Sequence, residues 1–97
     1  MLFEWNKHKN KLNFQKHGIS FEEAQEIFKS AVFTLEDSRK DYGEKRDISI
    51  GAIENVIIVV MVHTKRKDRV RIISARLANK TERKLYYEYL KEKNQRT

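Results

Sequence analysis

The stretch Val56-Ile57-Ile58-Val59-Val60-Met61-Val62 decides the fold, because it is apolar on both faces and rich in β-branched residues. Such a run predicts a strand in the middle of a sheet. Glu54-Asn55, immediately before it, predicts a tight hairpin that leads back to a partner strand over Arg46–Ile53. Lys65–Asp68 are expected to turn the chain into a further strand over Arg69–Arg76. The centre of the chain is therefore predicted to be an antiparallel meander.

The segments on either side of this meander carry the signals of helix ends. Asn6 can cap a helix that Gly18 ends, and Ser20-Phe21-Glu22-Glu23 is a capping box for a second helix. Asn79-Lys80-Thr81-Glu82 is a similar pattern before the last helix. The elements expected outside the meander are a short edge strand at Leu2–Trp5, a strand at Ala31–Glu36, and helices at Lys7–His17, Phe21–Ser30 and Lys80–Asn94. The predicted class is α+β, with a small antiparallel sheet, two N-terminal helices and one C-terminal helix.

The apolar side chains of the first and last helices predict how each one packs. The first helix has few apolar anchors beyond Leu12 and Phe14, so it is expected to be mostly exposed and cationic. The last helix is expected to pack on the sheet through an arc formed by Ala78, Leu85, Tyr89 and Leu90.

Length and composition limit the protein class. Residues 1–97 are expected to form one domain, because so short a chain leaves no room for a second core. There is no cysteine, which excludes disulfides and thiolate sites. No stretch approaches the roughly 18 apolar residues of a membrane span, and the first residues run into lysines, the reverse of a signal peptide. A cytoplasmic protein without a membrane partner is therefore expected.

The net charge of +7 is distributed unevenly along the chain. Residues 1–17 hold four lysines and one acid, and residues 65–97 hold 12 basic and four acidic residues. Residues 22–47, in contrast, hold five basic and eight acidic residues. If the two basic ends meet in the fold, they form one basic face that suits a polyanion such as nucleic acid. A solvated, solubilising surface is the alternative.

The residue types that most cofactors require are missing or scattered. The three histidines, His8, His17 and His63, are far apart in sequence, and no carboxylate cluster accompanies them, so no metal site is expected. Glycine-rich phosphate loops are absent as well, so no nucleotide-dependent chemistry and no cofactor are expected.

RNA can be cut without a metal, because a base can take the 2′-OH proton while cations stabilise the charge of the transition state. Arginine suits the second task, since its planar fork stays charged and binds phosphate bidentately. The candidates are Arg46, Arg71, Arg76 and Arg83 as cations, with Glu44 and His63 as titratable neighbours. Structural alternatives stand beside these roles: strand-edge ion pairs for Arg71 and Arg76, a surface pair of Glu44 with Arg46, and a structural role for His63. For the nearby Glu82 the alternative is helix capping alone.

Several motifs together resemble the BrnT family of ribonuclease toxins, which have a RelE-like fold. The matching segments run from residue 3 to about residue 88, in the family's order and spacing. They are Phe3-Glu4-Trp5, the run from Asn13 to Ala24, Gly43-Glu44-Lys45-Arg46, Gly51, Arg71-Ile72-Ile73-Ser74-Ala75-Arg76, Ala78 and Glu82-Arg83.

The resemblance implies an endoribonuclease that halts translation and needs no cofactor. It also implies a BrnA-like antitoxin, which neutralises the toxin and brings the complex to operator DNA. Carried over by position, Arg71, Arg76 and Arg83 are phosphate and transition-state cations, Glu44 and His63 are acid–base candidates, and Arg46 supports them. Lys65, Arg66, Lys67 and Lys80 are expected to contact the nucleic acid. Two other functions stay open: a binding module without catalysis, and a protein whose basic surface serves only an acidic antitoxin.

Strand alternation sets one condition on this site. Arg71 and Arg76 are an odd number of positions apart, so a regular strand turns them to opposite faces. Both can reach one site only if the strand ends or bulges before Arg76.

Overall fold

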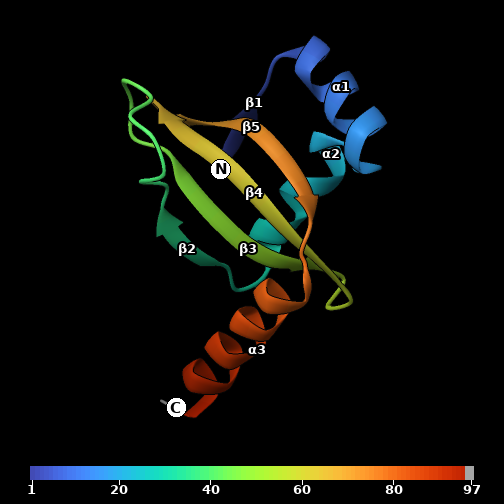
Figure 1. The fold of residues 1–97 in the computed structure, drawn as a ribbon, viewed down its shortest axis with the longest axis vertical. Coiled ribbons are helices and arrows are strands. Elements are labelled where there is room, and N and C mark those ends of the chain that lie inside the picture. The colour runs from blue at the N-terminus through green and yellow to red at the C-terminus, as the bar shows by residue number, and fades with distance from the viewer. Residues whose placement is uncertain (96–97) are drawn as a thin grey trace.

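The computed structural model describes residues 1–95, so the last two residues of the predicted domain lie outside the described part. The described chain is α+β, as predicted (Figure 1). Its elements are β1 (Leu2–Glu4), α1 (Lys7–His17), α2 (Phe21–Ala24), the 3₁₀ helix η1 (Gln25–Lys29), β2 (Phe33–Glu36), β3 (Asp47–Ile53), β4 (Ile57–Arg66), β5 (Arg69–Leu77) and α3 (Lys80–Gln95).

The strands form one sheet in the order β1-β5-β4-β3-β2. The apolar stretch forms β4 in the centre, and the strands from β2 to β5 make the predicted antiparallel meander. The expectation of a purely antiparallel sheet was wrong, because β1 pairs with β5 in parallel. The reason is tertiary: Phe3 packs on the ring of Phe28 at 5.4 Å and joins the core beneath η1, so the chain enters alongside β5.

The second helix differs from its prediction. The capping box of Ser20 with Glu23 forms as expected, but α-helical winding ends at Ala24 and continues as η1. The tighter helix packs Ile27 directly against Gly51 of β3, where an added Cβ would lie 2.8 Å from the Cβ of Ile27. Only glycine leaves room for this approach, which explains why β3 has a glycine among its apolar residues at this position.

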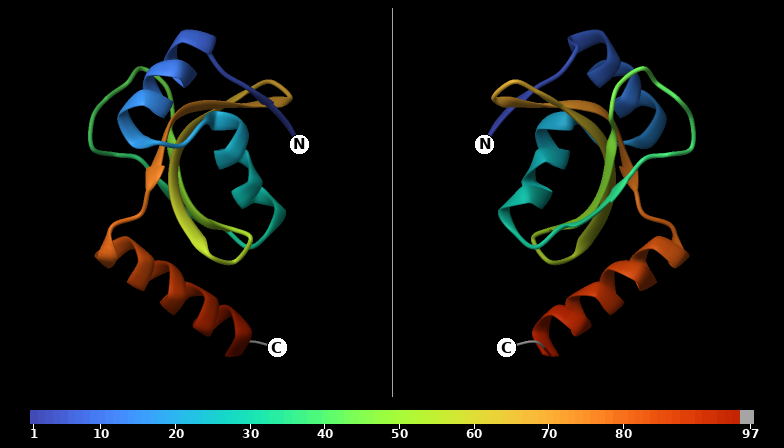
Figure 2. Two further views of the ribbon diagram at one scale, coloured as in Figure 1. Left: turned by 90° about the vertical axis from the view of Figure 1, so that its right-hand side faces the viewer. Right: turned by 90° about the vertical axis from the view of Figure 1, so that its left-hand side faces the viewer.

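The sheet is covered on both faces, but unequally. One face packs against α2 and η1, with Val59, Met61 and Ile72 among its buried residues. The other face packs against α3 through Ile50, Ala52, Ile58 and Val60. Figure 2 shows α2 and η1 on one side of the strands and α3 running below the sheet. The core therefore has two parts, separated by the sheet.

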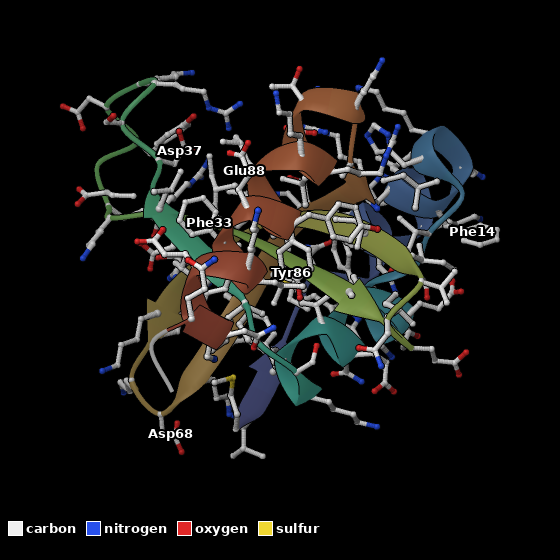
Figure 3. The ribbon with its side chains drawn as sticks, turned by 90° about the horizontal axis from the view of Figure 1, so that it is seen from below. Phe14, Phe33, Asp37, Asp68, Tyr86 and Glu88 are labelled. Atoms are coloured by element: carbon white, nitrogen blue, oxygen red, sulfur yellow. The ribbon has the colours of Figure 1, made fainter. Side chains whose placement is uncertain are left out.

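The side of α3 that is buried differs from the predicted arc. Tyr89 and Leu90 pack on the sheet as expected, but Leu85 is 42% exposed. Tyr86 takes the buried place, and its hydroxyl donates a hydrogen bond to the carbonyl of Ala31 at 2.8 Å. Figure 3 shows Tyr86 between the helix and the sheet. The phenol is buried there because its polar end has a partner.

The first helix is attached through a polar residue. Leu12 and Phe14, its expected anchors, are 48% and 53% exposed, and Phe14 points away from the sheet in Figure 3. Asn13 is buried instead, and its amide exchanges two hydrogen bonds with the backbone of Ala75, at 2.7 and 3.1 Å. Beyond the end of β1 this side chain satisfies the free edge of β5 in place of a strand.

The two basic segments of the chain meet in part. Strand β1 pairs with β5, and Asn13 of α1 bonds to the backbone of Ala75, so residues 1–17 lie along the first part of residues 65–97. Helix α3 lies at the other end of the molecule from α1, in both Figure 1 and Figure 2. Among residues 1–95, no helix is long and apolar enough to cross a membrane.

Candidate functional site

The α3-facing side of the sheet is covered only at one end. Helix α3 packs on Ile50 and Val60, but two positions further along each strand the same face presents Ile48 and Val62, which are only half-buried. Ser74 lies opposite Val62 and completes this row. We call this uncovered surface, together with the polar residues that border it, the open face.

A row of polar side chains borders the open face, running from β1 across β5 and β4 to the residues that flank β3 and β2. Thr64 pairs with Arg71, and Arg71 pairs with Glu4. One residue beyond the pairing of Asp47 with His63 stands Arg46, whose carbonyl accepts the backbone N–H of Asp37 at 2.8 Å. Residues that pair across strands share a face of the sheet, so this row presents two arginines on one surface.

A β-bulge brings a third arginine to the open face. Val62 pairs with Ser74 and His63 with Ile72, so Ile73 is an extra residue in β5. Ile72 and Ala75 consequently share the core under η1, although they are three positions apart. Arg71 and Arg76 therefore point to the same side of the sheet. This is the bulge before Arg76 that strand alternation required if both arginines were to reach one site.

Arg76 is held at the border of the open face by Glu82. Its Nη1 and Nη2 each donate to one carboxylate oxygen at 2.7 Å, a bidentate pair. Hydrogen bonding to Glu82 raises the pKa of Arg76, and hydrogen bonding to Arg76 lowers the pKa of Glu82. Glu82 also accepts the backbone N–H of Asn79 at 2.9 Å, so it both caps α3 and orients the arginine.

The other two arginines of the open face are paired as well. Arg71 donates to Glu4 at 2.7 Å, and both side chains are about one third exposed. Arg46 donates to Glu44 at 3.4 Å while its guanidinium lies 4.0 Å from the centre of the Tyr42 ring. The surface pair predicted for Glu44 and Arg46 is thus present, and both residues stand at the open face.

His63 lies on the opposite side of the sheet from the arginines. It shares a face with Met61, contacts Ser49 Oγ through Nε2 at 2.8 Å, and stands edge-on to the ring of Phe28. Burial lowers its pKa, and the charge of Asp47 opposes this only in part. The structure therefore does not bring His63 together with Arg71 and Arg76.

The remaining predicted residues occupy several different surfaces. Arg83 is exposed and donates to the carbonyl of Ala78 at 2.9 Å, and Lys80 is the exposed first residue of α3. Lys65 and Lys67 line a cavity of about 460 Å³ beside His63, next to the hairpin where Figure 3 labels Asp68. Arg66 donates to Glu44 at 3.1 Å and so reaches the border of the open face.

The structure also contains residues that sequence reasoning missed. Arg39 and Tyr42 lie in the loop of residues 37–46, which stands out from the sheet on the side of the open face (Figure 2). They were missed because they lie within residues 22–47, which hold more acidic than basic residues, although the spacing of Asp37 and Arg39 is a signal for a local ion pair. Within the described chain, no three His, Cys, Asp or Glu side chains are grouped as metal ligands.

Comparison with known proteins identifies the family. A family model described as the ribonuclease toxin BrnT of a type II toxin–antitoxin system matches residues 5–82. The chain belongs to the BrnT family. The matched range contains all three arginines of the open face and Glu82, so the site lies within the part that defines the family.

A solved BrnT structure has the same fold. The crystal structure of the Brucella abortus ribonuclease toxin BrnT superposes with a TM-score of 0.61 at 23% identity, and the match covers 82% of this chain and all of that one. No curated protein matches the chain. The resemblance to BrnT toxins, first read from the motifs, is confirmed; ribonuclease activity and an antitoxin are attributes of the family's description.

Proposed function

We propose that this protein is a toxin that cuts RNA on its open face without a metal ion, and that this cleavage inhibits translation. The observation that carries the proposal is the bulge in β5, which turns Arg71 and Arg76 to one side together with Arg46. A RelE-like mode of action, with the RNA chain lying across the exposed sheet, is part of the same proposal. A BrnA-like antitoxin restrains the toxin and carries the complex to operator DNA.

The proposed reaction is an internal transesterification. The 2′-oxygen attacks the phosphorus, the bond to the 5′-oxygen breaks, that oxygen takes a proton from water, and the products are a 2′,3′-cyclic phosphate and a 5′-hydroxyl. Arg71 and Arg76 stabilise the additional negative charge on the phosphoryl oxygens. Glu44, which stands at the same border, is the group proposed to take the 2′-OH proton. His63 has no part in this mechanism, because it faces the other side of the sheet.

The experiment is cleavage of a defined RNA by the purified protein in EDTA. We expect fragments that end in a 2′,3′-cyclic phosphate or in the 3′-phosphate formed from it. Cleavage that stops on chelation and returns with Mg²⁺ would overturn the metal-free mechanism.

One observation favours a second candidate function, a binding module without catalysis. Each arginine of the open face already has a carboxylate partner, as expected of purely structural ion pairs. That module would bind RNA and produce no fragments. Expression in cells without the antitoxin separates the two, because only the catalytic function produces translation arrest together with new RNA ends.

A further inference from the structure

The loop of residues 37–46 holds one exposed arginine in a fixed position. The Arg39 side chain is 65% exposed, yet its Nε and Nη2 donate to the two carboxylate oxygens of Asp37 at 2.8 and 2.9 Å. The Asp37 side chain is fully buried and accepts the backbone N–H of Arg39 as well, at 3.2 Å. Hydrogen bonding to Arg39 keeps the pKa of that carboxyl well below its usual range. Asp37 therefore stays an anion, and it orients Arg39.

This arrangement resembles the one at Arg76. Each guanidinium forms an ion pair with a carboxylate that is more buried than the arginine: Asp37 for Arg39, and Glu82 for Arg76. Arg39 uses its Nε–Nη2 edge for this pair and Arg76 its Nη1–Nη2 edge. Because a guanidinium has five N–H groups, each arginine keeps donors for another acceptor.

The two arginines also act on each other. Asp37 follows β2 on the α3-facing side of the sheet, and its loop stands out over the open face in Figure 2. The positive charge of Arg39 also opposes the rise in the pKa of Arg76, as the smallest of its causes. A phosphate accepts hydrogen bonds from several guanidinium donors at once, so the free N–H groups of Arg39 suit such a ligand.

We propose that Arg39 binds a backbone phosphate of single-stranded RNA, in an orientation that Asp37 holds ready. The proposal depends on the proposed function only for the identity of the ligand as RNA. It assigns Arg39 a contact with substrate, and Asp37 the part of a positioning residue that acts through Arg39.

The test is the affinity of a short 2′-O-methyl RNA, which cannot be cleaved, measured by fluorescence anisotropy over a range of salt. Arg39→Ala is expected to weaken binding about tenfold and to reduce the salt slope by about 0.7, the contribution of one phosphate on a single strand. Arg39→Lys keeps the charge but loses the fork, so binding should weaken while the slope stays nearly unchanged. Lys11→Ala, which removes the same charge from α1, is the matched control and should bind almost as the wild type does.

Asp37→Asn separates an oriented site from a merely positive surface. The change makes the protein more basic, so simple attraction predicts tighter RNA binding, whereas a site built on Asp37 predicts weaker binding. Melting is measured alongside, and if Asp37→Asn does not fold, the Arg39→Lys variant, which leaves Asp37 with a cation, decides. Unchanged affinity in both Arg39 variants, or tighter binding by a folded Asp37→Asn, would overturn the proposal.

Two further measurements identify the ligand and keep this proposal apart from the proposed function. If the Arg39 variants lose affinity for inorganic phosphate but bind RNA with the wild-type affinity, the site binds a free ion and the proposal fails. A wild-type protein that cleaves RNA while binding is independent of Arg39 refutes the site alone. Conversely, Arg39-dependent binding without any cleavage refutes the ribonuclease and supports the site.

Discussion

Three arginines of the open face, Arg46, Arg71 and Arg76, each carry a carboxylate partner. Exposed ion pairs contribute little to stability, commonly less than about 1 kcal/mol. Their value here is orientation, because a guanidinium held by one edge presents the other edge in a fixed direction. A substitution at such a residue should therefore reduce activity much more than it reduces stability.

Arg76 gives the sharpest form of this expectation. Arg76→Ala should slow RNA cleavage roughly 100-fold, the typical loss on removing one transition-state donor, and Arg76→Lys should also slow it because lysine lacks the fork. Melting should change little. Arg83→Ala is the comparison, and it should lose less, since the Arg83 guanidinium is occupied by the carbonyl of Ala78. Full activity in Arg76→Ala would remove Arg76 from the site.

His63 should affect stability rather than catalysis. Its folded pKa is lowered by burial, so below about pH 6.5 the unfolded chain takes up a proton before the folded chain does. The stability that the neutral imidazole contributes is therefore complete above this pH and is lost as pH falls below it. His63→Gln should flatten the dependence of melting on pH between 7 and 5, and should keep cleavage at neutral pH. Loss of cleavage in a well-folded His63→Gln would return histidine to the mechanism.

Among the elements, α1 shows a helix whose attachment depends on one amide. Asn13 makes three hydrogen bonds, to the backbone of Ile19 and to both backbone groups of Ala75. A buried backbone group that loses its partner costs about 1–3 kcal/mol. The polar anchor also explains how a helix with so few buried apolar residues stays on the sheet.

Asn13→Ala is accordingly expected to lower the free energy of unfolding by roughly 2–4 kcal/mol, because it strands the N–H and carbonyl of Ala75. Leu12→Ala on the same helix is the control, and it should stay within about 0.5 kcal/mol of the wild type, since Leu12 is largely exposed. Both values come from urea unfolding. Equal losses in the two variants would show that α1 is attached by apolar contacts after all.

The elements also show which signals the sequence contains. The caps at Asn6, Gly18 and Ser20 and the strands of the meander were predictable, because each depends on chemistry within a few residues. The parallel pairing of β1 and the extra residue Ile73 were not, since both depend on contacts between distant segments. From strand alternation it could be predicted that Arg71 and Arg76 share a site only if the strand bulges, but the bulge itself is visible only in the structure.

Across the described part of the molecule, the two basic segments meet where β1 and α1 lie along β5, whereas α3 lies at the other end. The candidate site was predictable only in part. The motif arginines could be recognised from the sequence, whereas Arg39 lies within residues 22–47, whose net charge is negative. Whole-chain charge predicts that a polyanion binds, but not where. Exposed apolar side chains, such as Leu77 and Ile57 at the rim of a cavity of about 490 Å³, add a surface of another kind.

A partner that binds only the folded toxin should raise its melting temperature. For one site the gain is about 2.7 kcal/mol when the free partner is at 100 times its Kd. We expect the toxin to co-purify with the product of a neighbouring antitoxin gene and to melt higher in that complex. Calorimetry of the toxin alone and with partner in excess measures the shift, and an unchanged melting temperature at saturation would contradict the expected complex.

The pairing of the first strand with the last has a consequence for how the protein is made. Glu4 meets Arg71, 67 residues later, and Arg76 finds Glu82 only after a further part of the chain has followed. Synthesis adds roughly 5–20 residues per second, so for several seconds a nascent chain contains every early element but no assembled site. The nascent chain therefore has no Arg76 held by its carboxylate partner until Glu82 has been added, and the site is assembled only after the elements that surround it have been made.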